Sequence, residues 1–254
     1  MNEAIEGKQI VVWFSCGIAS AVAAQKTLEL YGKKNTVRLI YNPVAEEDSD
    51  NLRFLKDCEN WFSQTIEIHS NPLWPSSSIV DVFNKKRYIS GIAGAPCTKE
   101  LKKGARYYFE KTNEIDFHVL GFTSDEKHRH ERFVKGERSN VLPVLIDLNL
   151  AKEDCMRIAF KYGIKPPRVY SLGFSNANCV GCVKSSSPTY WNLVRKHFPE
   201  IFNQRAEQSR EIGCKLVKLK GKRVFLDELP ENAKGGKLKT YNIECGIFCS
   251  ETEE

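Results

Sequence analysis

Residues 9–31 read QIVVWFSCGIASAVAAQKTLELY, and this stretch decides the fold class. Its first six residues, 9–14, form a short apolar run that is typical of a buried parallel strand. Residues 20–31 are rich in Ala and Leu at helical spacing, and Gly32 ends the predicted helix. The loop over residues 15–20 therefore joins the end of a strand to the start of a helix.

The alternation of strand and helix continues along the chain. We expect further strands over residues 36–41, 65–69, 116–121 and 141–146, and helices over residues 50–63, 98–110 and 151–162. This order is typical of an α/β fold in which a Rossmann-like parallel sheet carries helices on both faces.

The pattern changes beyond Cys182. Residues 188–212 are predicted to be helical, and residues 214–226 alternate like a small hairpin around Lys220-Gly221. We therefore place a soft domain boundary near residue 185. It divides the chain into an α/β domain over residues 1–185 and a helical and loop-rich C-terminal extension with a cysteine-containing tail over residues 186–254.

The composition indicates a globular chain without a membrane segment. No apolar run approaches the length that spans a bilayer. The start, Met1 to Lys8, is polar and acidic, unlike a secretory signal, so we expect a cytoplasmic protein. A net charge of +6 favours anionic partners, although a generic basic surface would carry the same charge.

The loop over residues 15–20 has the features of an anion site. Free backbone N–H groups at a helix start, together with the helix dipole, favour a phosphate. Gly17 allows a ligand to approach the backbone, and Ser15 and Ser20 add hydroxyl donors. Many strand-to-helix turns contain Gly and Ser and bind nothing, so the motif alone leaves phosphate binding open.

The loop resembles the PP-loop of the adenine nucleotide α-hydrolase superfamily, especially that of the phosphoadenosine phosphosulfate (PAPS) reductase-like family. Further segments similar to that family follow in order: Asn42-Pro43, Cys97-Thr98-Lys99-Glu100-Leu101-Lys102, Gly121 to Glu126 with Arg129, Pro143 to Asp147, and Cys179-Val180-Gly181-Cys182. The resemblance spans residues 9–185 and implies that residues 1–185 form a PP-loop adenine nucleotide-binding domain. It implies that an adenine nucleotide contacts Ser15, Cys16, Gly17, Ile18, Ala19, Ser20, Asn42 and Gly121.

The same resemblance implies that Lys102 and Arg129 contact the sulfate or phosphate. Either cation could instead be a solvated helix charge, and Glu126 could be an ordinary partner of Arg129. The loop departs from the family pattern at Ala19, where ATP pyrophosphatases have an Asp. This departure favours the reductase branch over release of pyrophosphate from ATP, without excluding ATP.

The cysteines indicate metal or redox chemistry, because cytoplasmic chains rarely keep disulfides. Cys179 and Cys182 form a CxxC pair, which serves zinc, iron–sulfur clusters or thiol redox exchange. The family resemblance implies a [4Fe-4S] cluster held by Cys97, Cys179, Cys182 and Cys245. It also implies a tail thiol as nucleophile, which we assign to Cys249; the reverse assignment of Cys245 and Cys249 stays open.

Taken together, the resemblance implies an oxidoreductase of the PAPS or adenylyl sulfate (APS) reductase type that uses the tail thiol in sulfur chemistry. One alternative is an ATP-dependent sulfurtransferase or base-modifying enzyme acting on tRNA or DNA, with basic residues 215–223 and 234–239 as the nucleic-acid contact. Another is a non-catalytic nucleotide-binding regulator. The expected ligand is APS, PAPS or ATP. A thiol reductant protein, a nucleic acid and a second copy of the chain in a homodimer remain open as partners.

Overall fold

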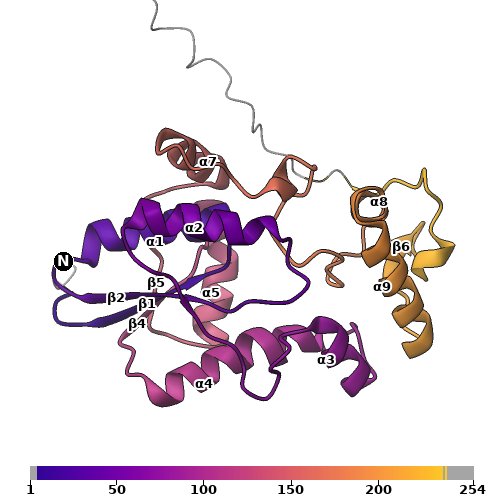
Figure 1. The fold of residues 1–254 in the computed structure, drawn as a ribbon, viewed down its shortest axis with the longest axis horizontal. Helices are drawn as coiled ribbons and strands as arrows, with labels where there is room; N and C mark the ends of the chain where they lie inside the picture. Colours follow the sequence, from indigo (N-terminus) through magenta and orange to yellow (C-terminus); the bar gives the residue numbers. More distant parts are fainter. Residues whose placement is uncertain (1–4, 237, 239–254) are drawn as a thin grey trace, which may run out of the picture.

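The computed structural model describes residues 5–236 and residue 238, and its centre is a five-stranded parallel sheet (Figure 1). The strand order is β3-β2-β1-β4-β5, with every neighbouring pair parallel. The strands are β1 (Gln9–Phe14), β2 (Thr36–Tyr41), β3 (Glu67–Ile68), β4 (Phe117–Val119) and β5 (Val141–Leu142). The predicted α/β, Rossmann-like fold class is confirmed.

Helices cover both faces of this sheet. The helices up to β5 are α1 (Ile18–Tyr31), α2 (Asp50–Phe62), α3 (Ile79–Lys86), α4 (Gly104–Thr112) and α5 (Lys127–Gly136). Those that follow are α6 (Val144–Asp147), α7 (Lys152–Lys161), α8 (Pro188–His197) and α9 (Pro199–Ile212). Helices α1, α2 and α7 lie above the sheet in Figure 1, and α3 and α4 lie below it.

The central strand β1 is buried on both sides because successive side chains point to opposite faces. Ile10, Val12 and Phe14 belong to the main hydrophobic core with α1, whereas Val11 and Trp13 pack in a smaller cluster with Phe109 of α4. This explains why residues 9–14 are continuously apolar and do not alternate.

Proline explains two differences from the predicted elements. The expected strand over residues 141–146 ends at Leu142, and α6 begins at Val144, because Pro143 has no N–H to donate to a strand partner. The expected helix over residues 188–212 is two helices that meet at Phe198, with Pro199 in the first turn of α9.

The expected helix over residues 98–110 begins instead with a π-helical segment, Thr98–Lys103, that leads into α4.

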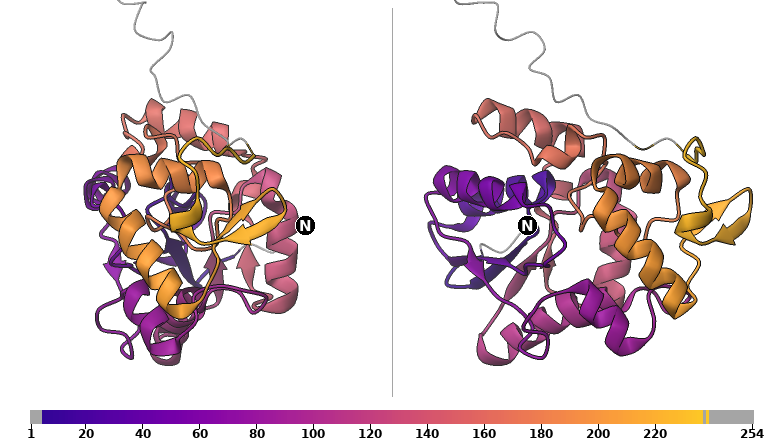
Figure 2. Two further views of the ribbon diagram at one scale, coloured as in Figure 1. Left: turned by 90° about the vertical axis from the view of Figure 1, so that its right-hand side faces the viewer. Right: turned by 45° about the vertical axis from the view of Figure 1, so that its right-hand side comes forward.

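The C-terminal extension packs beside α3 (Figure 2). Gln208 of α9 donates hydrogen bonds to the Val80 carbonyl at 3.1 Å and to Asn84 Oδ1 at 2.6 Å. Trp191 and Phe202 are part of the same hydrophobic core as the sheet. The boundary near residue 185 stays a prediction.

The expected hairpin is present as β6 (Val217–Leu219) and β7 (Lys222–Val224). Its turn residues Lys220 and Gly221 both have positive φ, as a tight two-residue hairpin turn requires. None of the helices in the described ranges combines the length and the apolarity needed to cross a bilayer.

Candidate active site

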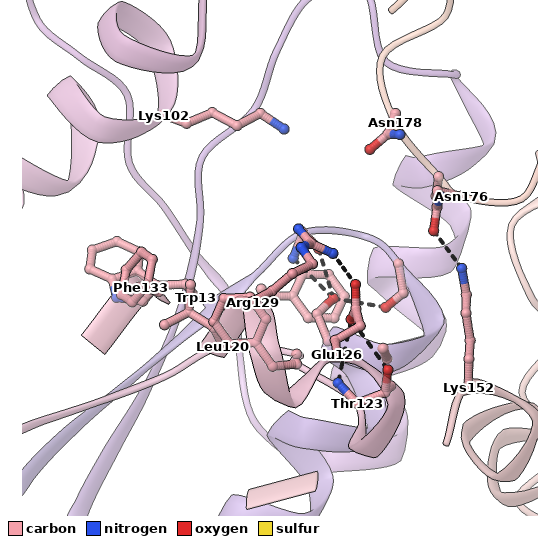
Figure 3. A pocket seen from close by; sticks show the side chains of 18 of the residues that line it. Trp13, Lys102, Leu120, Thr123, Glu126, Arg129, Phe133, Lys152, Asn176 and Asn178 are labelled. Carbon is pink, nitrogen blue, oxygen red and sulfur yellow. Dashed lines mark hydrogen bonds and ion pairs between the residues drawn. The ribbon is translucent and has the colours of Figure 1, made fainter. Parts of the chain in front are cut away.

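A cavity of about 720 Å3 lies at the carboxyl ends of the central strands (Figure 3). Its wall includes Phe14 at the end of β1, Asn42 just after β2, and Leu120 just after β4. Open parallel sheets bind ligands at this edge, where the chain leaves neighbouring strands in opposite directions. The sheet topology therefore brings together segments that are up to 106 residues apart in the sequence.

The loop over residues 15–20 forms one side of this cavity, through Ser15, Gly17, Ala19 and Ser20. The N-cap residue of α1 is Gly17, which has no side chain to cap the helix, and the Ile18 N–H donates to the Tyr170 hydroxyl at 3.5 Å, so the rest of the first turn has no capping side chain from the N-cap residue. Ser20 Oγ donates to the Gly17 carbonyl at 2.7 Å and accepts from the Ser15 N–H at 3.1 Å. The loop is thus held by its own hydroxyl groups in an anion-binding geometry.

Two predicted contact residues have side chains that do not line this cavity. Cys16 and Ile18 are fully buried in the core. Cys16 has a φ of 51°, and this left-handed backbone directs the chain through the turn. Its Sγ lies 3.8 Å from the Asn51 carbonyl, and burial raises the pKa of the thiol. These two residues can offer a ligand only their backbone.

Gly121 lines the cavity and also allows close packing. A Cβ at this position would lie 2.8 Å from the Ser20 nitrogen and 3.0 Å from the Ala19 carbonyl carbon. Since both atoms are backbone, they cannot yield as a flexible side chain would. The segment after β4 approaches the first turn of α1 only because residue 121 is glycine.

Two further residues at the loop were not among the predicted site residues. The Tyr170 hydroxyl accepts a hydrogen bond from the Ile18 N–H at 3.5 Å, and Lys152 Nζ lies 5.1 Å from the Tyr170 ring centroid. Lys152 also donates to Asn176 Oδ1 at 2.6 Å (Figure 3). Both residues line the cavity, and both lie within or beside segments that carry the family resemblance.

The side of the cavity away from Lys152 and Asn176 is apolar and largely aromatic. Trp13, Leu120 and Phe133 gather there (Figure 3). The Arg106 guanidinium lies 5.9 Å from the Trp13 ring centroid and 5.6 Å from that of Phe133, a cation–π arrangement. Sequence reasoning missed Arg106 and Phe133 because α5 was not predicted and because Arg106 resembles an ordinary helix charge.

Lys102 lines the cavity and is paired with a buried carboxylate. Its Nζ is 3.7 Å from Glu47 Oε1, and the Glu47 side chain is only 5% exposed. Glu47 Oε2 accepts hydrogen bonds from the Tyr41 hydroxyl and from Asn51 Nδ2. Desolvation opposes the charged form of Lys102, but the nearby acidic groups, Cys179 and Glu47 first among them, outweigh it and raise the pKa of the ammonium.

Arg129 is exposed and forms an ion pair with Glu126 one turn earlier (Figure 3). The Glu126 carboxylate also accepts a hydrogen bond from Thr123 Oγ1 at 3.2 Å. Arg129 therefore lines the cavity and has the ordinary helical partner that the sequence left open, while its contact with a sulfate or phosphate stays a prediction.

A second cavity, of about 480 Å3, adjoins the first and is lined by Cys97, Cys179 and Cys182. The two cavities share part of their walls, including Lys102, Arg129 and Asn178. Burial raises the pKa of Cys97, and it raises that of Cys179 to about 12. The structure therefore brings the three predicted cysteines, Cys97, Cys179 and Cys182, to one cavity that adjoins the cavity of the loop over residues 15–20.

These thiols suit an iron–sulfur cluster by their chemistry. Among the residues that the structure describes, no three His, Cys, Asp or Glu side chains converge as ligands of a metal ion. The irons of a cluster, however, are separate atoms, and each takes its own thiolate, so cluster ligands need not converge on one point. Cys245 and Cys249 lie outside the described residues, and their roles as ligand and nucleophile stay predictions.

No protein-family description and no curated protein matches the chain. A similar solved structure is that of the U34-tRNA thiolase NcsA from Methanococcus maripaludis with its [4Fe-4S] cluster. The two share 13% sequence identity and a TM-score of 0.47, over 85% of this chain and 76% of that chain.

Proposed function

We propose that this chain is a nucleotide-dependent enzyme of sulfur chemistry. An adenine nucleotide occupies the larger cavity with its phosphates at residues 15–20, and the chemistry takes place at the adjoining cysteines. The observation that carries this proposal is that the two cavities share part of their walls, because Lys102 and Arg129 line both.

Each part of the larger cavity has a role in this proposal. The N–H groups at the start of α1 hold phosphate oxygens, and the aromatic side with Trp13 and Phe133 suits a nucleobase. Lys102 stabilises the charge that develops on a phosphate or sulfate oxygen, because Glu47 fixes its ammonium at the junction. A cluster held by Cys97, Cys179 and Cys182 would supply electrons or a sulfur-binding metal beside the nucleotide.

Ala19 supports a reductase acting on APS or PAPS. It lines the cavity with a methyl group where a carboxylate would hold magnesium and pyrophosphate. In that reaction a thiolate attacks the sulfonyl sulfur, the S–O bond to the nucleotide phosphate breaks, and the nucleoside phosphate leaves. A dithiol reductant then supplies two electrons, releases sulfite and becomes a disulfide.

A second candidate is ATP-dependent sulfur transfer to a base of tRNA or DNA. The observation that favours it is the hairpin β6–β7, whose exposed side chains include Lys218, Lys220 and Lys222. Such a basic projection suits a phosphate backbone, and the contact would weaken steeply as salt concentration rises. The presence of two adjoining cavities leaves room for a base beside the nucleotide.

One experiment distinguishes these reactions. Anaerobic full-length protein, reconstituted with iron and sulfide, is incubated with APS, PAPS or ATP, with and without tRNA and DNA. Sulfite release from APS or PAPS identifies the reductase. Formation of AMP and pyrophosphate from ATP only with nucleic acid identifies the sulfurtransferase. Absence of nucleotide binding by calorimetry would refute the proposal in both forms.

The variant Lys102→Met tests the junction directly. Loss of one charged hydrogen-bond donor should weaken nucleotide binding about ten- to hundredfold, since such bonds contribute about 1.5–3 kcal/mol. Lys99→Met is the matched control, because Lys99 is exposed, belongs to the same π-helical segment and lines neither cavity. Equal affinities for the two variants would contradict the role assigned to Lys102.

A further inference from the structure

Arg205 of α9 is a charged residue with no exposed surface. Its Nη1 donates to Gln208 Oε1, and its guanidinium carbon lies 5.1 Å from the centroid of the Phe83 ring. Its Nε and Nη2 are buried and have no hydrogen-bond partner among the described residues. A buried guanidinium with two unused donors is costly unless a negative group balances it.

The position of Arg205 in α9 places it beside the CxxC turn. A Cβ at Gly181, inside that turn, would lie 3.1 Å from Ile201 Cγ2. Ile201 and Arg205 are four residues apart, and therefore lie on the same face of the helix. Tyr190 of α8 reaches the same turn, since its hydroxyl accepts a hydrogen bond from the Cys182 N–H at 2.7 Å.

The groups near Arg205 include two of the predicted cluster cysteines. The acidic groups that act on it are Glu46, Cys97, Cys179 and Tyr190. Glu46 contributes negative charge, but its carboxylate accepts hydrogen bonds at the start of α3, from Ser78 Oγ at 2.6 Å and from the Ile79 N–H at 2.9 Å, and accepts none from Arg205 Nε or Nη2. The Tyr190 hydroxyl is engaged with the Cys182 N–H. A negative group held by Cys97 and Cys179 would therefore lie near the two unused donors of Arg205.

We propose that Arg205 is a positioning residue of the cysteine cavity, where its buried charge balances an iron–sulfur cluster held by Cys97, Cys179 and Cys182. This inference rests on the proposed function of those cysteines. Thiolate-held clusters carry net negative charge, and a nearby buried cation makes the addition of an electron easier. The C-terminal helices α8 and α9 thereby contribute to the cluster site. The CxxC motif alone does not predict this contribution.

The test compares reduction potentials in the reconstituted full-length protein. Wild type, Arg205→Met, Arg205→Gln and Arg205→Lys are loaded anaerobically with ferrous iron and sulfide. Iron and sulfide content, midpoint potential and melting temperature are then measured. The two variants without charge should be about tenfold harder to reduce, a shift of about 59 mV to more negative potential for one electron. Arg205→Lys keeps the charge and should recover most of the wild-type potential.

Arg195→Met is the control for structural damage. Arg195 of α8 donates to the Leu229 carbonyl at 2.7 Å and lies 4.3 Å from the Phe202 ring centroid, so its loss disturbs the same helix pair. It should lower the melting temperature and leave the midpoint potential unchanged. Equal potentials in wild type, Arg205→Met and Arg205→Gln would overturn the inference, and so would a wild type that binds no iron. Nucleotide affinity and its dependence on Lys102, measured in the same preparation, test the proposed function separately.

Discussion

At the scale of single residues, the larger cavity depends on close backbone contact between two segments. The segment after β4 meets the first turn of α1 at Gly121. Within β4 itself, burial lowers the pKa of His118. His118, in β4, is 4% exposed, and its Nδ1 accepts a hydrogen bond from Trp13 Nε1 at 3.1 Å. Substitutions at Gly121 and at His118 test these two features separately.

Gly121→Ala should destabilise the fold and weaken nucleotide binding. The added methyl group would press on the backbone of Ala19 and Ser20, and overpacking of this kind costs about 1–3 kcal/mol. Urea unfolding and nucleotide titration measure the two effects. Gly136→Ala, at the end of α5 with nothing within 4 Å, should change neither by more than about 1 kcal/mol. Equal stabilities for the two variants would contradict the close approach.

His118 should make stability depend on pH. Burial lowers its pKa from the ordinary 6.5 to about 4, so the folded state favours neutral imidazole. Between these two values the unfolded chain binds the proton more readily. The His118 contribution is therefore complete above about pH 6.5, falls as the pH is lowered, and levels off below about pH 4, with a loss of about 3 kcal/mol.

Unfolding free energies between pH 4 and pH 7.5 measure this loss. His118→Gln keeps an acceptor for Trp13 and should remove this part of the pH dependence. His128→Gln, which changes an exposed histidine of α5, should leave it intact. If both variants follow the wild-type profile, His118 is not the responsible group.

At the scale of elements, α9 packs against the CxxC turn. Gly181 has a φ of +70° and contacts Ile201, whereas Gly213 at the end of α9 has a φ of +78° and nothing within 4 Å. Both glycines hold a left-handed backbone, but only Gly181 also lies against another element.

Gly181→Ala and Gly213→Ala separate backbone strain from packing. Each should cost about 1–2 kcal/mol, because an L side chain disfavours the left-handed region. Only Gly181→Ala should also reduce iron retention after reconstitution, since it pushes α9 away from the cysteines. Thermal unfolding and iron analysis of both proteins provide the comparison, and equal iron contents would argue against contact between α9 and the centre.

At the scale of the whole molecule, one hydrophobic core runs through the sheet, its covering helices and the C-terminal extension. Phe14 and Val22 belong to this core together with Trp191, Phe202 and Leu216, which all follow residue 185. Shared burial of this kind couples the unfolding of the two parts.

Scanning calorimetry of the full chain should therefore show one transition. Its calorimetric and van't Hoff enthalpies should agree, as they do for cooperative two-state unfolding. Trp191→Leu should lower the temperature of that one transition without creating a second one. Two resolved transitions would instead support an independently folding extension beyond residue 185.

The sequence by itself determined the local features of this protein. Residues 9–31 specify a strand, a glycine-containing loop and a helix, because apolar runs, helical spacing and the position of Gly17 act within a few residues. The sequence also predicts that Cys97, Cys179 and Cys182 share one site, and the structure places them around one cavity.

Only the tertiary structure decided how these features combine. Helix α5 was missed because its sequence, KHRHERFVKG, has too few apolar residues to show helical spacing. Lys102 beside Glu47, Arg106 beside Trp13, and Arg205 beside the CxxC turn are contacts between distant segments. Their meaning depends on burial, and burial is set by the packing of the whole chain and not by neighbours in the sequence.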